Sequence, residues 1–108
     1  MKNRVMYLAL DNRRVGCLAM SVDRITNRVR YALSVVHDTD TFDRQYAQEL
    51  AFRRLRETPR EVALPPEANG HQISMAVLRN VSRWSEAPTK ARAAADKWLR
   101  LARAKTAG

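Results

Sequence analysis

The feature that most constrains the fold is a pair of strand-like segments that are apolar on both faces. Residues 5–10 are apolar throughout, and residues 15–22 carry apolar or small side chains at both odd and even positions. Successive side chains of a strand point to opposite faces, so a sheet with one face in water shows alternation of apolar and polar residues. These strands therefore need cover on both faces, from helices of the same chain or from a second copy of the protein.

A third segment, residues 28–35, alternates with period two and places four apolar side chains on one face: Val29, Tyr31, Leu33 and Val35. Residues that favour turns separate the three segments at 11–14 and at 23–27. Residues 61–64 are a candidate for a short additional edge strand. The sequence thus predicts an antiparallel meander of three to four strands, with residues 1–36 as its main part.

Helical periodicity begins after the meander. Residues 40–58 predict a helix, with Asp40 as its N-cap, Asp43 in its first turn and Pro59 marking its end. The apolar residues of this segment recur at steps of three and four and define one buried stripe: Phe42, Tyr46, Ala47, Leu50, Ala51 and Leu55.

Residues 65–71 are rich in proline and predict a loop, and residues 72–105 predict two further helices. The alternation at 72–77 is also compatible with a strand. The buried positions expected in the two helices are Ile73, Val77, Leu78, Val81 and Trp84, then Ala91, Ala94, Ala95, Trp98, Leu101 and Ala102. With about three helices packed on the meander, the predicted fold class is α+β, in a single domain over residues 1–108.

Composition restricts the class of protein and its location in the cell. The chain has 108 residues, 45% of them hydrophobic and 29% charged, which is typical of one globular domain. No apolar run approaches the ~20 residues that cross a bilayer, and the first residues do not form a secretory signal. A single cysteine, Cys17, lies within an apolar segment and is expected to be buried. We therefore expect a cytoplasmic protein with no membrane partner.

The residues that most enzymes and metal sites require are sparse. The two histidines, His37 and His71, are far apart, and only three glycines are present, so neither a zinc site nor a glycine-rich phosphate loop is indicated. The aspartates at 38, 40 and 43 lack the spacing of a calcium loop and are better interpreted as helix caps. We expect no metal, no cofactor and no catalysis.

Positive charge is the strongest indication of a partner. The net charge is +9, and sixteen of the twenty basic residues are arginine, whose planar guanidinium binds phosphate in a bidentate manner. Arg53 and Arg54 lie near the end of the first predicted helix, and Arg79 and Arg83 share one face of the second. These four are the candidate ligand-binding residues. The alternative is that they complement helix ends or lie in solvent.

A short motif adds a family resemblance. The pattern Asp40-x-Phe42-x-Arg44 is followed by Leu50-Ala51-x-x-Arg54-Leu55, and a hairpin or meander precedes it. Over residues 15–56 the chain resembles small phage-encoded anti-defence proteins, and its size and layout resemble the anti-Thoeris cyclic-nucleotide sponge family. One difference is that Ala47-Gln48 stands where the motif has Gly-Arg.

The resemblance implies a phage protein that sequesters a phosphate-bearing, cyclic nucleotide signal without hydrolysing it, as a homo-oligomer, with arginines on the phosphates. Arg54 is the one candidate that the motif itself supports, and it is expected to contribute most. Two alternatives stay open: a basic protein that binds nucleic acid, and an anti-defence inhibitor that binds a host effector protein directly.

Overall fold

A computed structural model describes residues 2–36 and 41–107 of the chain. Four antiparallel strands form one sheet in the order β1-β2-β3-β4, and three helices accompany it. The elements along the chain are β1 (Lys2–Leu10), β2 (Arg13–Asp23), β3 (Arg28–Val35), α1 (Arg44–Glu57), β4 (Arg60–Ala63), α2 (Gly70–Arg83) and α3 (Thr89–Ala107). The predicted α+β class is confirmed, and so is the short fourth strand.

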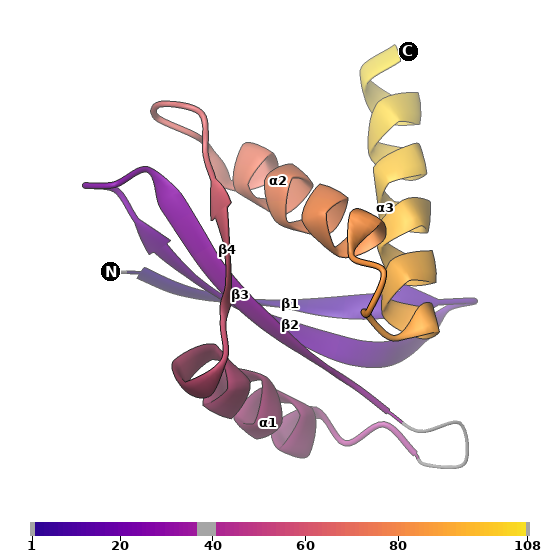
Figure 1. Cartoon of the computed structure of the whole chain (residues 1–108). Coiled ribbons are helices and arrows are strands. Elements are labelled where there is room, and N and C mark those ends of the chain that lie inside the picture. Colours follow the sequence, from indigo (N-terminus) through magenta and orange to yellow (C-terminus); the bar gives the residue numbers. More distant parts are fainter. Residues whose placement is uncertain (1, 37–40, 108) are drawn as a thin grey trace.

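Helices cover both faces of the sheet. Helix α1 lies on one face, and α2 and α3 lie on the other (Figure 1). The strands that are apolar on both sides therefore receive their cover from within the chain, which was one of the two arrangements that the sequence left open.

The turns between the first three strands use residues that tolerate positive φ angles. Asp11 and Asn12 have φ of 50° and 64° and form a two-residue hairpin loop, so β2 begins at Arg13 rather than at the predicted residue 15. At the next turn the Asp23 carboxylate accepts a hydrogen bond from the backbone N–H of Ile25 at 2.9 Å, and Asn27 has φ of 54°. Such side chain to backbone bonds favour turns over continued strands.

The two faces of the sheet differ in the size of their side chains. On the α2–α3 face, large residues such as Leu18, Tyr31 and Ile73 are fully buried. On the α1 face the contact is made by small residues, with Cys17 and Ala19 of β2 against Ala47 and Ala51 of α1. The small side chains allow the α1 backbone to approach the sheet closely.

Helix α1 differs from the prediction at its start and in one buried residue. Residues 41–43 are not helical and Asp43 is the N-cap, its carboxylate accepting from Tyr46 N–H at 3.1 Å, so the helix begins at Arg44 rather than at residue 40; Asp40 itself lies outside the described residues. Tyr46 is 59% exposed, so its predicted burial is wrong. Helix α1 contacts the sheet through Ala47 and Ala51, and Tyr46 lies outside this contact.

Helix α2 starts two residues earlier than predicted. The Asn69 side chain accepts from Gln72 N–H and the Gln72 side chain accepts from Asn69 N–H, both at 2.8 Å, which forms a capping box and makes Gly70 the first helical residue. Residues 72–77 are helical and not a strand.

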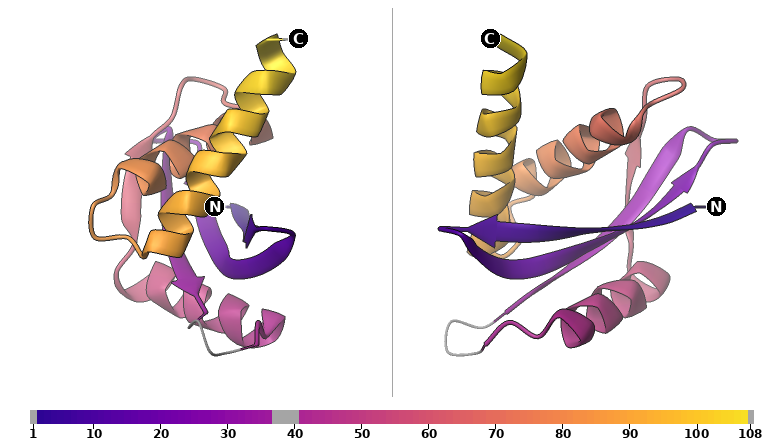
Figure 2. Two further views of the ribbon diagram at one scale, coloured as in Figure 1. Left: turned by 90° about the vertical axis from the view of Figure 1, so that its right-hand side faces the viewer. Right: turned by 180° about the vertical axis from the view of Figure 1, so that it is seen from behind.

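Helix α3 corrects one further predicted core position. Leu101 is 57% exposed, whereas Leu99 is buried. Figure 2 shows that the C-terminal part of α3 extends past the sheet. Leu101 lines an open groove between β1 and α3 and therefore stays largely in solvent. The two tryptophans, Trp84 and Trp98, are half-buried at the margin of the core.

Candidate phosphate-binding groove

The four arginines singled out from the sequence do not form one site. Arg53 and Arg54 lie on α1, and Arg79 and Arg83 lie on α2, on the opposite face of the sheet (Figure 1). A ligand of nucleotide size cannot contact both pairs in one copy of the chain.

Arg54 is bonded within the fold. Its Nη1 donates a hydrogen bond of 2.9 Å to the backbone carbonyl of Leu33. Strand β4 pairs only with residues 28–31 of β3, so the following residues of β3 have no strand beside them on that edge. The guanidinium of Arg54 supplies a donor to this part of the edge and joins the end of α1 to the sheet.

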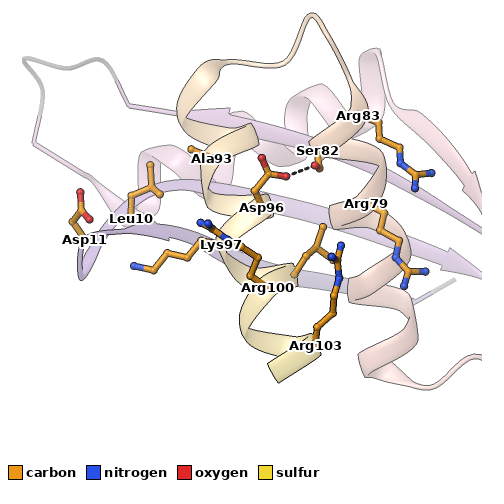
Figure 3. Close-up of a pocket in the computed structure, with 11 residues that line it drawn as sticks. Leu10, Asp11, Arg79, Ser82, Arg83, Ala93, Asp96, Lys97, Arg100 and Arg103 are labelled. Atoms are coloured by element: carbon orange, nitrogen blue, oxygen red, sulfur yellow. Dashed lines mark hydrogen bonds between the residues drawn. The ribbon is translucent and has the colours of Figure 1, made fainter. Parts of the chain in front are cut away.

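A groove between α2 and α3 brings the other pair together with basic residues of α3. The cavity has a volume of about 710 Å³ and opens to solvent (Figure 3). Five basic and two acidic side chains are among those that line it: Arg79, Arg83, Lys97, Arg100 and Arg103, with Asp11 and Asp96. Cations therefore exceed carboxylates along this surface, and it attracts anions.

Helical periodicity explains why these side chains meet. Arg79 and Arg83 are four residues apart and therefore share a face of α2, while the basic residues of α3 recur at steps of three. The apolar residues of both helices, such as Val77 and Leu99, are buried against the sheet and each other. Burying the apolar stripes turns the two basic stripes outward along the same groove.

A polar contact joins the two helices within the groove. The hydroxyl of Ser82 donates to the carboxylate of Asp96, as drawn in Figure 3. This bond holds Asp96 in place between the basic residues. The described lining contains neither histidine nor cysteine, so the hydroxyl of Ser82 has no imidazole or thiol beside it there. The groove is suited to binding an anion.

A second polar cluster lies where β3, β4 and α2 meet. The hydroxyl of the fully buried Tyr31 donates to Asn80 Oδ1 at 2.6 Å, and Arg60 Nε lies 3.2 Å from both oxygens. The Arg60 guanidinium also stacks on the Trp84 ring at 4.2 Å. Burial raises the pKa of Tyr31, against the opposing effect of Arg60. These contacts are satisfied inside the fold, and we assign them to stability.

The structure adds residues that the sequence did not select. Lys97, Arg100 and Arg103 of α3 were not among the four candidate arginines, and they line the groove together with Arg79 and Arg83. The signal in the sequence was their spacing of three residues; the sequence could not show which other helix this face meets.

No group of three or more potential metal ligands occurs among the described residues, and none of the described helices is long and apolar enough to cross a bilayer. A scan against protein-family models finds no match, and searches of curated proteins and of solved structures find no significant similarity. The function is therefore proposed from the groove and from the motif described above.

Proposed function

We propose that this protein binds a phosphate-bearing nucleotide in the groove between α2 and α3 and holds it without chemical change. The observation that carries the proposal is that five basic side chains from two helices line one cavity of about 710 Å³. That volume lies within the range of sites for small ligands. Guanidinium groups form strong charge-assisted bonds to phosphate oxygens, and their planes also stack on bases.

The proposed binding is not catalytic. The polar groups of the lining other than the cations are the Asp11 and Asp96 carboxylates and the Ser82 hydroxyl, and that hydroxyl already donates to Asp96. Attack on a phosphodiester requires an activated nucleophile or a metal-bound water, and the carboxylate that accepts from Ser82 is a weak base for a hydroxyl. The lining supports retention of the ligand.

The biological role that we propose rests on the motif in residues 40–55. We propose a phage anti-defence protein that sequesters a cyclic nucleotide signal in the cytoplasm of the infected bacterium. Among the four arginines that the sequence selected, Arg79 and Arg83 are the ones we assign to the phosphates, because they line the groove. The bond from Arg54 to Leu33 supports a structural role for Arg54 instead.

Calorimetry of the purified protein against a panel of cyclic and linear nucleotides tests the proposal. We expect saturable binding of at least one nucleotide, and release by heat followed by mass spectrometry should return it intact. Recovery of a cleaved product would make the protein an enzyme and refute the proposal, and so would the failure of every nucleotide to bind.

A matched pair of double variants separates the groove from the overall charge. Arg79→Ser with Arg83→Ser removes two exposed cations from the groove, and Arg53→Ser with Arg56→Ser removes two from α1 on the other face. A lost contact between arginine and phosphate costs about 1.5–3 kcal/mol, or tenfold or more in affinity. The groove variant should therefore lose more than tenfold and the α1 variant little. Equal losses would show that only net charge matters.

Nucleic acid is a second candidate, favoured by the stripe of basic side chains that Lys97, Arg100 and Arg103 form along α3. In that case log K falls linearly with log salt, because phosphate contacts release counterions. The variant at Arg79 and Arg83 would reduce the salt slope by about 1 for each phosphate contact that it removes. Tight binding of an oligonucleotide near 150 mM salt, with no uptake of mononucleotides, would favour this candidate over the first.

A further inference from the structure

Strand β1 forms an open edge of the sheet. It spans Lys2–Leu10, pairs with β2 along its length, and has no described strand on its other side. Long unpaired edges are ready-made templates for another strand, and proteins usually shorten or cover them. This open edge of nine residues can therefore pair with a further strand.

The register shows which backbone groups this edge presents. Val36 N–H donates to the Val15 carbonyl at 2.9 Å, so odd-numbered residues of β2 bond to β3. Because the pattern alternates in antiparallel sheets, even-numbered residues of β2 bond to β1, where Leu18 pairs with Met6. The outward N–H and C=O groups of β1 consequently belong to its odd-numbered residues, Val5 and Tyr7 at its centre.

Apolar surface flanks this edge on both faces of the sheet. Val5 is 37% exposed on the face that carries α1. On the other face, an apolar groove of about 290 Å³ lies between β1 and α3, lined in part by Met6, Trp98 and Leu101. Leu101 is 57% exposed beside this groove. A strand added to β1 would extend the sheet and place alternate side chains against the apolar groove.

We propose that the occupant is a second copy of this chain, paired through β1 in an antiparallel arrangement. A two-fold contact joins the same surface of both copies, so the surface must be complementary to itself. This edge meets the requirement, because apolar side chains flank it on both faces and Arg4 lies toward one end. Arg14 of β2 stacks on the ring of Tyr7 at 4.7 Å. Antiparallel pairing separates the basic starts of the two strands, at Arg4, whereas parallel pairing would align them.

The length of β1 selects the register. With the two-fold axis at Met6, the two strands overlap over their whole length, and Arg4 lies opposite Leu8 of the partner subunit rather than opposite its own copy. Val5 and Tyr7 then exchange backbone hydrogen bonds with Tyr7 and Val5 of the partner subunit. The Met6 side chains form the closely spaced, non-hydrogen-bonded pair at the axis.

This arrangement has a consequence for the groove between α2 and α3. The two-fold axis of an antiparallel ladder is perpendicular to the sheet, so α2 and α3 of both copies lie on the same side of one joined sheet. The two basic grooves then face the same direction. The pairing itself rests only on the β1 edge and does not depend on the proposed function.

Light scattering coupled to size exclusion tests the pairing. We expect the wild type at tens of micromolar to have about twice the 12.4 kDa mass of the chain. Val5→Pro removes an outward N–H that β2 does not use, and proline is tolerated at sheet edges, so the fold persists while the partner strand is blocked. Leu101→Lys places a charge beside the apolar groove. Both variants should raise the dimer dissociation constant more than tenfold with unchanged circular dichroism.

Ile25→Lys is the matched control, because Ile25 is 96% exposed at the turn after β2 and lies away from the β1 edge. It should remain dimeric. Met6→Cys should form a disulfide between copies on mild oxidation, whereas the buried Cys17 of the wild type should not. A wild type that stays monomeric at 100 µM, or a Val5→Pro variant that folds and dimerises normally, would overturn the proposal. Nucleotide calorimetry on the Val5→Pro variant measures binding to the groove independently of dimer formation, so the two proposals can fail separately.

Discussion

The polar cluster around Tyr31 predicts an unequal response to two substitutions in one hydrogen bond. Tyr31 is fully buried and its hydroxyl donates to Asn80 Oδ1 at 2.6 Å, while Arg60 Nε lies 3.2 Å from the same oxygen. In Tyr31→Phe the Asn80 oxygen still accepts from Arg60. The variant therefore loses the bond from Tyr31 to Asn80 and one arm of the shared Arg60 N–H, with no buried group left unpaired, at a cost of about 1 kcal/mol.

Asn80→Ala removes the acceptor of the Tyr31 hydroxyl and leaves that buried donor in place. The buried O–H of Tyr31 loses its acceptor, and an unsatisfied buried donor costs about 1–3 kcal/mol. The loss of the amide contacts with Arg60 adds to this cost, so we expect Asn80→Ala to destabilise the protein by about 2–3 kcal/mol. In the double variant no phenol O–H remains to be orphaned, so its destabilisation should be smaller than the sum of the two single effects.

Urea unfolding followed by tryptophan fluorescence and far-ultraviolet circular dichroism measures these differences. Thermal scans should show a decrease of about 4–8 °C in Tm for each 1 kcal/mol in a domain of this size. Tyr46→Phe is the control, because Tyr46 is 59% exposed and its change should stay within about 0.5 kcal/mol. Equal, additive effects of Tyr31→Phe and Asn80→Ala, or effects no larger than that of the control, would refute the reasoning.

Four further predictions concern the packing around the sheet. Burial raises the pKa of Cys17 from 9.0 to about 11, so folding favours its thiol form. The unfolding free energy should fall as pH rises from 9 toward 11, and the fall should be smaller in Cys17→Ala. The same thiol should react with a thiol reagent only after denaturation, and rapid labelling of the native protein would contradict its burial. In Gly16→Ala the new Cβ would lie 2.4 Å from the backbone oxygen of Ser34, so urea titration should show a loss of about 1–3 kcal/mol or more, and neutral behaviour would exclude the close approach. Ala51→Leu should cost about 1–3 kcal/mol by forcing α1 away from Cys17 and Ala19, and a stabilised variant would show that this contact is loosely packed.

Much of the architecture could be predicted because it depends on local patterns. The alternation in residues 28–35 and the turn residues between the strands are sufficient for an antiparallel meander, since the side-chain period of a strand is two. The continuous apolar character of residues 15–22 indicated cover on both faces, and α1 and α2–α3 supply it. Proline at 59 marked the end of α1 correctly because the residue before proline avoids the helical region.

Other features depended on contacts between distant segments. Tyr46 and Leu101 continue apolar stripes in their helices, yet both are exposed, because the sheet is narrower than the surface that each helix could bury. Arg54 was the ligand-binding candidate that the motif favoured, and only the fold places its guanidinium on the Leu33 carbonyl, beyond the part of β3 that pairs with β4. Neither the exposure of these two side chains nor the hydrogen bond of Arg54 could be predicted from the sequence of its own helix.

What the sequence determined by itself was therefore the set of elements, the α+β class and the excess of arginine. Periodicity and capping act over a few neighbouring residues, so they can be recognised in the chain before it folds. Only the tertiary structure decided that Arg79 and Arg83 meet the basic face of α3 and that Arg53 and Arg54 lie on the far side of the sheet. The physical reason is that the burial of apolar stripes orients each helix, and the charged faces take whatever positions that packing leaves to them.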